Sequence, residues 1–381
     1  MKFISLSDLK KRYHLRDYRF GLVFLTLCIA IFGVFMVNSA APHFMTRQLA
    51  GVIGGVVVMV IISLIDYKWV LRLYWVMYVF NLILLISTYL FGVTVNNARR
   101  WLAIGPENMQ LQFQPSDLTK IIVILFFAMF FTKKREKVNK PLTIIQAVLL
   151  MIPSLILILR QPNLSNTIVI GALFAVIVYL SGISQKFVAI VLGILIPAVA
   201  VFLIIVIQPN QNLIHDYQQT RILAWLNPEE FAGAEALQQN NSVMGIGSGQ
   251  LWGKGYNSDA SNSLKNANFI IEGETDFIFA IIGEELGFVG CSAVIILLLL
   301  IVISCIRIGF KAQDLAGKII CGGVGSLIGI QTFINIGVAT QMLPNTGLSL
   351  PFVSYGLTSV VTFFIGIGFV LNVGLQPDKR R

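Results

Sequence analysis

Long apolar runs constrain the fold of this chain more than any other feature of its sequence. A helix that crosses a bilayer needs about 20 apolar residues, and ten segments meet that requirement. They lie at about 20–40, 47–65, 70–91, 115–132, 141–159, 164–182, 187–208, 277–306, 317–340 and 357–375. Backbone groups in lipid must be hydrogen-bonded within the protein, so each run is expected to be a helix. The sequence therefore predicts an all-α polytopic membrane protein with about ten transmembrane helices.

The composition argues against the other common classes of protein. Of the 381 residues, 56% are apolar and only 12% are charged, whereas soluble domains carry about 25% charged residues. Most of the surface cannot face water, which excludes a soluble enzyme and a disordered chain. The four cysteines lie in apolar runs and form no Cys-x-x-Cys pair, which favours helix packing over metal binding or a disulfide scaffold.

The basic residues predict the orientation in the membrane. With the N-terminus in the cytoplasm, 20 of the 28 Lys and Arg residues face the cytoplasm and 7 face outside, as the positive-inside rule requires. The remaining one, Lys120, lies within a span. The expected layout is a cytoplasmic tail at 1–19, a ten-helix domain at 20–375 and a cytoplasmic tail at 376–381. This sorting accounts for the net charge of +10, so no nucleic-acid partner is expected.

One external loop, at about 209–276, is much longer than the others. Loops of this length are usually functional or disordered. Aromatic residues are spaced through it, so we expect it to be ordered and to contact the membrane surface. They are Trp225, Phe231, Trp252, Tyr256 and Phe269.

Carboxylates near the membrane are candidates for function because they are costly there. Asp276 stands where the long loop enters the eighth span, four residues after Glu272. It is expected to be half solvated and ionised, which makes it the candidate catalytic base. Glu284 and Glu285 follow about 12–13 Å deeper on the same helix. They are either supporting residues of the site or residues that serve helix packing.

Asp117 and Lys120 form a second candidate pair, inside the fourth span. Their i,i+3 spacing places them on one face of a helix, where they can pair. The pair either supports a site or is a structural ion pair.

Arginines on the external side oppose the usual charge bias. Arg99 and Arg100 immediately precede Trp101, and indole favours the membrane interface. Arg matches phosphate oxygens through a two-pronged hydrogen bond, so these residues, with Arg160 and Arg221, are candidates to bind an anionic lipid head group. The alternative is an ordinary interfacial anchor.

The glycine-rich stretch at 245–255 invites a phosphate-loop interpretation and fails it. A phosphate loop has a Gly separated by four residues from Gly-Lys, and a Ser or Thr directly after the Lys. Around Gly253-Lys254 these two positions are occupied by Ser248 and Gly255. A flexible or tightly turned surface loop is expected, with a backbone nest for an anion as the alternative. His215 is the lone histidine of the long loop, and no metal site is assigned.

Several segments together resemble the SEDS proteins (shape, elongation, division and sporulation) of the RodA, FtsW and SpoVE type. The resemblance covers nearly the whole chain in order. It rests on Trp101-Leu-Ala-Ile-Gly105, Gln114-Pro-Ser-Asp117-x-x-Lys120, Arg160-Gln-Pro-Asn163, Asp216-Tyr-Gln-Gln-x-Arg221, Gly245-Ile-Gly-Ser-Gly249, Thr275-Asp276-Phe277, Glu284-Glu285-Leu-Gly287 and Leu350-Pro-Phe-x-Ser354-Tyr-Gly356.

The resemblance implies a bacterial cytoplasmic membrane enzyme that polymerises peptidoglycan glycan strands from lipid II at the outer face. It also implies a class B penicillin-binding protein as partner. Asp276 matches the family's essential carboxylate, and Trp101, Lys120 and the region of Arg221 match positions tied to activity or substrate. The process served, whether elongation, division or sporulation, stays open.

The chemistry agrees with this assignment. An acceptor sugar hydroxyl needs a base, and a carboxylate at the membrane surface can accept its proton. Pyrophosphate leaves without a proton donor, but its growing charge needs the nearby cations, and a divalent cation is compatible with that role. An inverting glycosyltransferase is therefore expected. Two alternatives stay open: a flippase for the same precursor, and a catalytically silent scaffold for the penicillin-binding protein.

Overall fold

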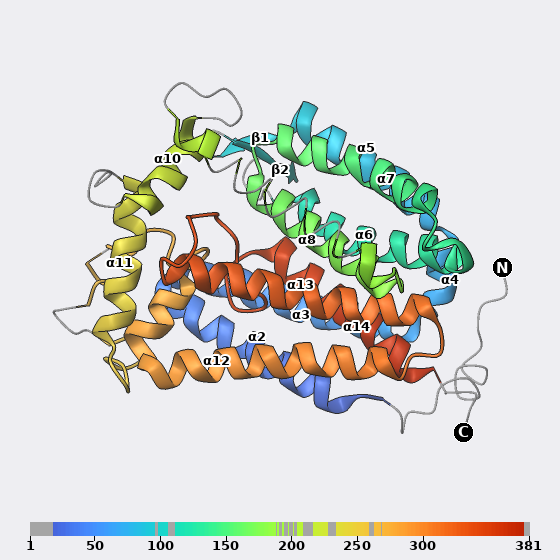
Figure 1. The fold of residues 1–381 in the computed structure, drawn as a ribbon. Helices are drawn as coiled ribbons and strands as arrows, with labels where there is room; N and C mark the ends of the chain where they lie inside the picture. The colour runs from blue at the N-terminus through green and yellow to red at the C-terminus, as the bar shows by residue number, and fades with distance from the viewer. Residues whose placement is uncertain are drawn as a thin grey trace.

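The computed structural model describes residues 18–95, 98–105, 111–187, 189, 193, 197, 201, 204–208, 216–227, 234–258, 263–267 and 269–376. Within this part of the chain, long helices lie side by side in one bundle (Figure 1). They are α2 (Phe20–Ala40), α3 (Met45–Leu64), α4 (Tyr67–Arg72), α5 (Tyr74–Phe91), α6 (Pro115–Lys133), α7 (Pro141–Arg160), α8 (Leu164–Leu180), α12 (Ile278–Phe310), α13 (Leu315–Ala339) and α14 (Leu357–Leu375). Two 3₁₀ turns, η2 (Pro42–Phe44) and η4 (Arg135–Lys137), connect neighbours.

These helices confirm the predicted multi-pass helical architecture. They match nine of the ten predicted spans, with the third span divided between α4 and α5. Eight helical segments among the described residues are long and apolar enough to cross a membrane, and α8 is a shorter apolar helix. The seventh predicted span, at 187–208, lies largely outside the described residues.

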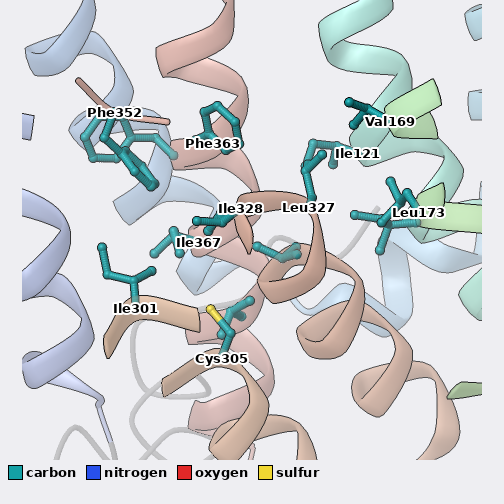
Figure 2. Packing of buried hydrophobic residues seen from close by; sticks show 14 of the residues in the cluster. Ile121, Val169, Leu173, Ile301, Cys305, Leu327, Ile328, Phe352, Phe363 and Ile367 are labelled. Atoms are coloured by element: carbon teal, nitrogen blue, oxygen red, sulfur yellow. The ribbon is translucent and has the colours of Figure 1, made fainter. Parts of the chain in front are cut away.

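α6 occupies the centre of the bundle. It packs against α5, α8, α13 and α14, and 83% of its apolar window is buried, compared with 28% for α7. A helix that is apolar all round is suited to such a central position. Ile121 of α6, Leu173 of α8 and Leu327 of α13 belong to one apolar cluster (Figure 2).

The loop between α5 and α6 forms a small sheet that the sequence reading did not predict. Strands β1 (Val93–Val95), β2 (Ala98–Ile104) and β3 (Leu111–Phe113) are antiparallel in the order β1-β2-β3. Leu102 pairs with Phe113. Strands this short carry too few alternating residues to stand out beside the apolar spans. The end of the bundle that carries this sheet is called the loop end below.

The long loop contains two helices, α10 (Asp216–Leu226) and α11 (Ala234–Ser248). They lie beyond the loop end of the bundle (Figure 1). The Trp225 indole N–H donates to the Gln341 carbonyl over 3.0 Å, and the Gln239 amide donates to two carbonyls at the end of α13 and just beyond it. These two segments therefore form helices that are hydrogen-bonded to the end of α13 and the residues just after it. Trp252 is 74% exposed, and Phe231 lies outside the described residues.

The prediction of a flexible or tightly turned surface loop at 245–255 is wrong for residues up to Ser248 and agrees with the turned, exposed segment that follows them. Its first residues continue α11, and the remainder packs against the kinked start of α12. A Cβ atom at Gly249 would lie 1.9 Å from the Gly283 carbonyl oxygen, and one at Gly253 would lie 2.1 Å from that of Glu285. Glycine is needed at these two positions because the backbone of one segment contacts the backbone of the other directly.

Candidate functional site

A cavity of about 630 Å³ opens at the loop end of the bundle. It brings together residues that are far apart in sequence, from the sheet, from α6, α8, α10, α13 and α14, and from the segments before α12 and α14. Its polar lining consists of Arg100, Trp101, Gln112, Gln114, Asp117, Lys120, Asn163, Asn166, Arg221, Glu272, Thr275, Asp276, Gln331, Ser349, Tyr355, Thr358 and Ser359. A cavity of this size that combines cations, carboxylates and amides is suited to a charged ligand.

Asp276 is held at the wall of this cavity by its backbone. The Asn335 amide donates to the Asp276 carbonyl over 2.8 Å, and the Ser354 hydroxyl donates to the Thr275 carbonyl over 2.6 Å. Gly347, at φ +69°, lies so close that a Cβ there would be 3.1 Å from Asp276 Oδ2. The position of the carboxyl group is therefore fixed by two neighbouring segments.

The surroundings of Asp276 raise its pKa to about 7. Burial is the largest cause, followed by the charge of Glu272 and a hydrogen bond between the two carboxyl groups. Arg221 and Arg100 act in the opposite direction. The side chain is half-buried, as the sequence suggested, and the loss of water and the neighbouring carboxyl group both disfavour its ionised form. A base with this pKa is matched to proton transfer at physiological pH.

Two arginines line the cavity near Asp276. Arg100, on β2, donates through Nη2 to the Pro162 carbonyl, which links the sheet to the segment between α7 and α8. Arg221 is half-buried on α10. Both are close enough to influence the Asp276 carboxyl group. An anion beside Asp276 would therefore meet two guanidinium groups.

Lys120 is the third cation of the lining and lies in the bundle core. Its Nζ atom is 2.8 Å from Asp117 Oδ1 and 3.0 Å from Gln331 Oε1, and the residue is 1% exposed. The i,i+3 pair predicted from the sequence is confirmed. Gln331 continues the network by donating to the Ser349 carbonyl over 2.9 Å. A polar chain thus joins the floor of the cavity to the segment before α14.

Several residues in or beside the cavity lining were not among the candidate site residues chosen from the sequence. Gln331 and Asn335 lie four residues apart on α13, so they share one helix face. Two amide side chains in a membrane-spanning helix could have predicted a polar site, because such groups form hydrogen bonds in the interior of a bundle. Asn163 caps α8 by accepting from the Asn166 N–H over 3.2 Å. No sequence pattern predicted that Ser349 and Ser359 belong to the site, because only the tertiary structure brings them to the cavity.

Four candidate site residues lie elsewhere. Arg99 and Arg160 are exposed and do not line the cavity. Glu284 pairs with Lys254 over 2.8 Å, and Glu285 pairs with Lys265 over 2.6 Å. The packing alternative therefore holds for the two glutamates, which fasten the long loop to α12.

No group of three or more His, Cys, Asp or Glu side chains is placed to hold a metal ion within the described part of the chain. Glu272 and Asp276 are the two neighbouring carboxyl groups of the cavity, and they share a hydrogen bond. His215 lies outside the described residues. The divalent cation considered from the sequence stays a prediction.

The fold and the cavity define a multi-pass helical membrane protein with a charged site at one end of its bundle. The family model for the cell cycle proteins FtsW, RodA and SpoVE matches residues 13–378. The chain belongs to this family. It is 32% identical to the probable peptidoglycan glycosyltransferase FtsW of Geobacter metallireducens, over 94% of this chain and 95% of that protein. It is 31% identical to the peptidoglycan glycosyltransferase MrdB of Escherichia coli K12, over 92% of each.

Solved structures agree with this membership. A chain from a peptidoglycan synthase complex that coordinates polymerization and crosslinking superposes with a TM-score of 0.76 at 27% identity, over 94% of this chain and 97% of that one. The rod shape determining protein RodA of Thermus thermophilus gives a TM-score of 0.68 at 26% identity, over 94% and 96%. The resemblance read from the sequence motifs is confirmed.

Proposed function

We propose that this chain is a peptidoglycan glycosyltransferase that polymerises lipid II into glycan strands at the outer face of the bacterial cytoplasmic membrane. The observation that carries the proposal is the Asp276 carboxyl group, placed with Arg100 and Arg221 in one cavity at the loop end. The names of the relatives supply the reaction class. In this proposal the tails at 1–19 and 376–381 are cytoplasmic, and the loop at 209–276 faces outside.

Asp276 is the general base of the proposed reaction. It removes the proton from the acceptor sugar hydroxyl while that oxygen attacks the anomeric carbon of the donor sugar. The bond from that carbon to the pyrophosphate oxygen breaks, and the configuration inverts. Burial is the main reason that the pKa of Asp276 is raised, and Glu272 supports the step because its charge and hydrogen bond raise that pKa further.

The cations of the lining bind the polyprenyl pyrophosphate. Arg100 and Arg221 stabilise the charge that grows on the leaving group, since prepositioned donors are most effective in a partly desolvated site. Lys120, paired with Asp117, adds a positioned ammonium group to the deeper part of the cavity. Trp101 supplies an aromatic wall at the height of the sugars. Arg99 and Arg160 are left without a role in binding the substrate.

A class B penicillin-binding protein is the proposed partner. The solved relative comes from a peptidoglycan synthase complex, and strands made by a polymerase need crosslinking. Whether the complex serves elongation, division or sporulation is left open, because the relatives named FtsW and MrdB match this chain at 32% and 31% identity.

The decisive experiment measures strands made from lipid II by the purified chain in membranes, with the partner added. We expect Asp276→Asn to lose at least about a hundredfold in rate, because the base is removed while the shape is kept. Glu274→Gln is the matched control, since Glu274 is a neighbouring carboxylate that does not line the cavity, and it should retain activity.

Each alternative has its own outcome in the same system. Equal strand formation by Asp276→Asn and the wild type would remove Asp276 from the mechanism. Transfer of lipid II across vesicles without polymer would identify a flippase. Stimulation of the partner with no polymer made by this chain would identify a scaffold.

A further inference from the structure

A second cavity lies at the end of the bundle opposite to Asp276. It is a groove of about 440 Å³ between the first turns of α2 and the last turns of α12, called the α2–α12 groove below. The two helices pack along each other, and the first residues of α2 lie beside the last residues of α12 (Figure 1). The groove shares no lining residue with the Asp276 cavity.

Three cations surround the mouth of the groove. Arg19 precedes α2, while Arg307 and Lys311 lie at the end of α12. All three are exposed, and the lining includes no acidic residue among those that the structure describes. Three neighbouring positive charges without an acid in the lining are complementary to an anion.

The deeper part of the groove is apolar. Leu22, Phe24 and Leu25 follow Arg19 along α2, and a rise of 1.5 Å per residue places Leu25 about 9 Å further into the span. Phe24 is 66% exposed, so the groove is open toward the surrounding lipid. The cavity therefore combines a cationic mouth with an apolar wall within the membrane, which fits an amphipathic anion better than a soluble one.

We propose that the α2–α12 groove binds an anionic phospholipid. Its phosphate is held by Arg19, Arg307 and Lys311, and its acyl chain lies along Phe24 and Leu25. In the proposed orientation this lipid belongs to the cytoplasmic leaflet, where basic pockets between helices recognise such headgroups.

A neighbouring groove at the same end of the bundle shows why this one is favoured. There Lys133 Nζ is 3.3 Å from the Tyr74 hydroxyl and 4.5 Å from the centre of its ring. Lys134 donates to Gln146 and lies 4.8 Å from the centre of the Phe130 ring. Those cations already have protein partners, whereas the three of the α2–α12 groove surround a cavity.

The test is native mass spectrometry of the purified full chain with equal amounts of phosphatidylglycerol and phosphatidylcholine of identical acyl chains. We expect the wild type to retain phosphatidylglycerol about tenfold more than phosphatidylcholine. The triple variant Arg19→Gln, Arg307→Gln, Lys311→Gln should lose this preference. The matched control is Arg135→Gln, Lys137→Gln, Lys140→Gln, which removes three exposed charges outside the groove and should keep it.

A steric variant tests the same site without changing charge. A Cβ at Gly21 meets no atom within 4 Å, so Gly21→Leu is expected to fold and to block the groove, lowering retention of phosphatidylglycerol by about the same factor. Equal loss in the control triple would mean that diffuse charge acts, and the proposal would fail. Full retention by Gly21→Leu, or loss of the preference in millimolar inorganic phosphate, would also overturn it. Neither measurement depends on polymerase activity.

Discussion

Two carboxyl pairs lie within 14 residues of each other, and their surroundings give them different uses. Glu284 and Glu285 are 1% and 3% exposed and are closed off by Lys254 and Lys265. Glu272 and Asp276 instead line a cavity with room for a ligand. A buried carboxylate satisfied by a lysine stabilises the fold, whereas one that faces a cavity with a raised pKa is available for chemistry. Position in the chain alone does not separate the two pairs.

The largest effect expected from this contrast is on stability. Glu284 also accepts hydrogen bonds from the backbone N–H groups of Leu264 and Lys265, so Glu284→Ala leaves three part-buried donors, including Lys254 Nζ, without their carboxylate partner. We expect the free energy of unfolding to fall by about 3–5 kcal/mol, measured by denaturation in detergent. Glu274→Ala should change it little. A small loss of unfolding free energy for Glu284→Ala would show that this carboxylate does not stabilise the fold.

Gly347→Ala should separate activity from stability. The added Cβ would lie 3.1 Å from Asp276 Oδ2, at a backbone φ of +69° that side chains rarely adopt. We expect strand synthesis to fall by at least about tenfold because the base is displaced. Gly171→Ala is the control, since its Cβ meets nothing within 4 Å. Activity unchanged in Gly347→Ala would show that the carboxyl position is not critical.

The pH dependence of kcat/KM tests whether Asp276 differs from the paired glutamates in being available as a base. The pKa of Asp276 is raised to about 7, and the ionised form is the base, so kcat/KM should rise with pH through about 7. Glu272→Gln removes the charge that raises this pKa and should move the rise to lower pH by up to about one unit. A profile that does not move would exclude coupling between the two carboxyl groups.

The smallest effect is expected at the arginines outside the cavity. Arg99→Gln should keep activity within about twofold, whereas Arg100→Gln, one residue further along β2, should lose at least about tenfold. Initial rates with lipid II measure both. Equal effects would mean that the sheet, and not the cavity lining, presents the substrate.

Much of the architecture could be predicted from the sequence because backbone groups in lipid must be hydrogen-bonded within the protein, which makes each apolar run a helix. Apolar runs located α2, α3, α6 and α14 to within a few residues. The Asp117–Lys120 pair followed from helix periodicity alone. The glycine-rich segment was predicted correctly only in its turned part, because the helix up to Ser248 and the backbone contacts of Gly249 and Gly253 with α12 depend on residues distant in the chain.

The candidate site was only partly readable. Asp276, Arg100 and Arg221 were identified, but Arg99 and Arg160 looked equally suitable from their external position. In the structure both residues are exposed and neither lines the cavity. Ser349, Ser359 and Gln331 became part of the site through tertiary packing.

The sequence by itself determined that this chain is a bundle of membrane-spanning helices with a carboxylate at the entrance to one of them. The reason is that backbone hydrogen bonding and hydrophobicity act locally, along each segment. Only the tertiary structure decided which charges share a cavity and which neutralise each other. Electrostatic interactions and the loss of water depend on distances between segments, and those distances are set when α6, α12 and α13 pack together.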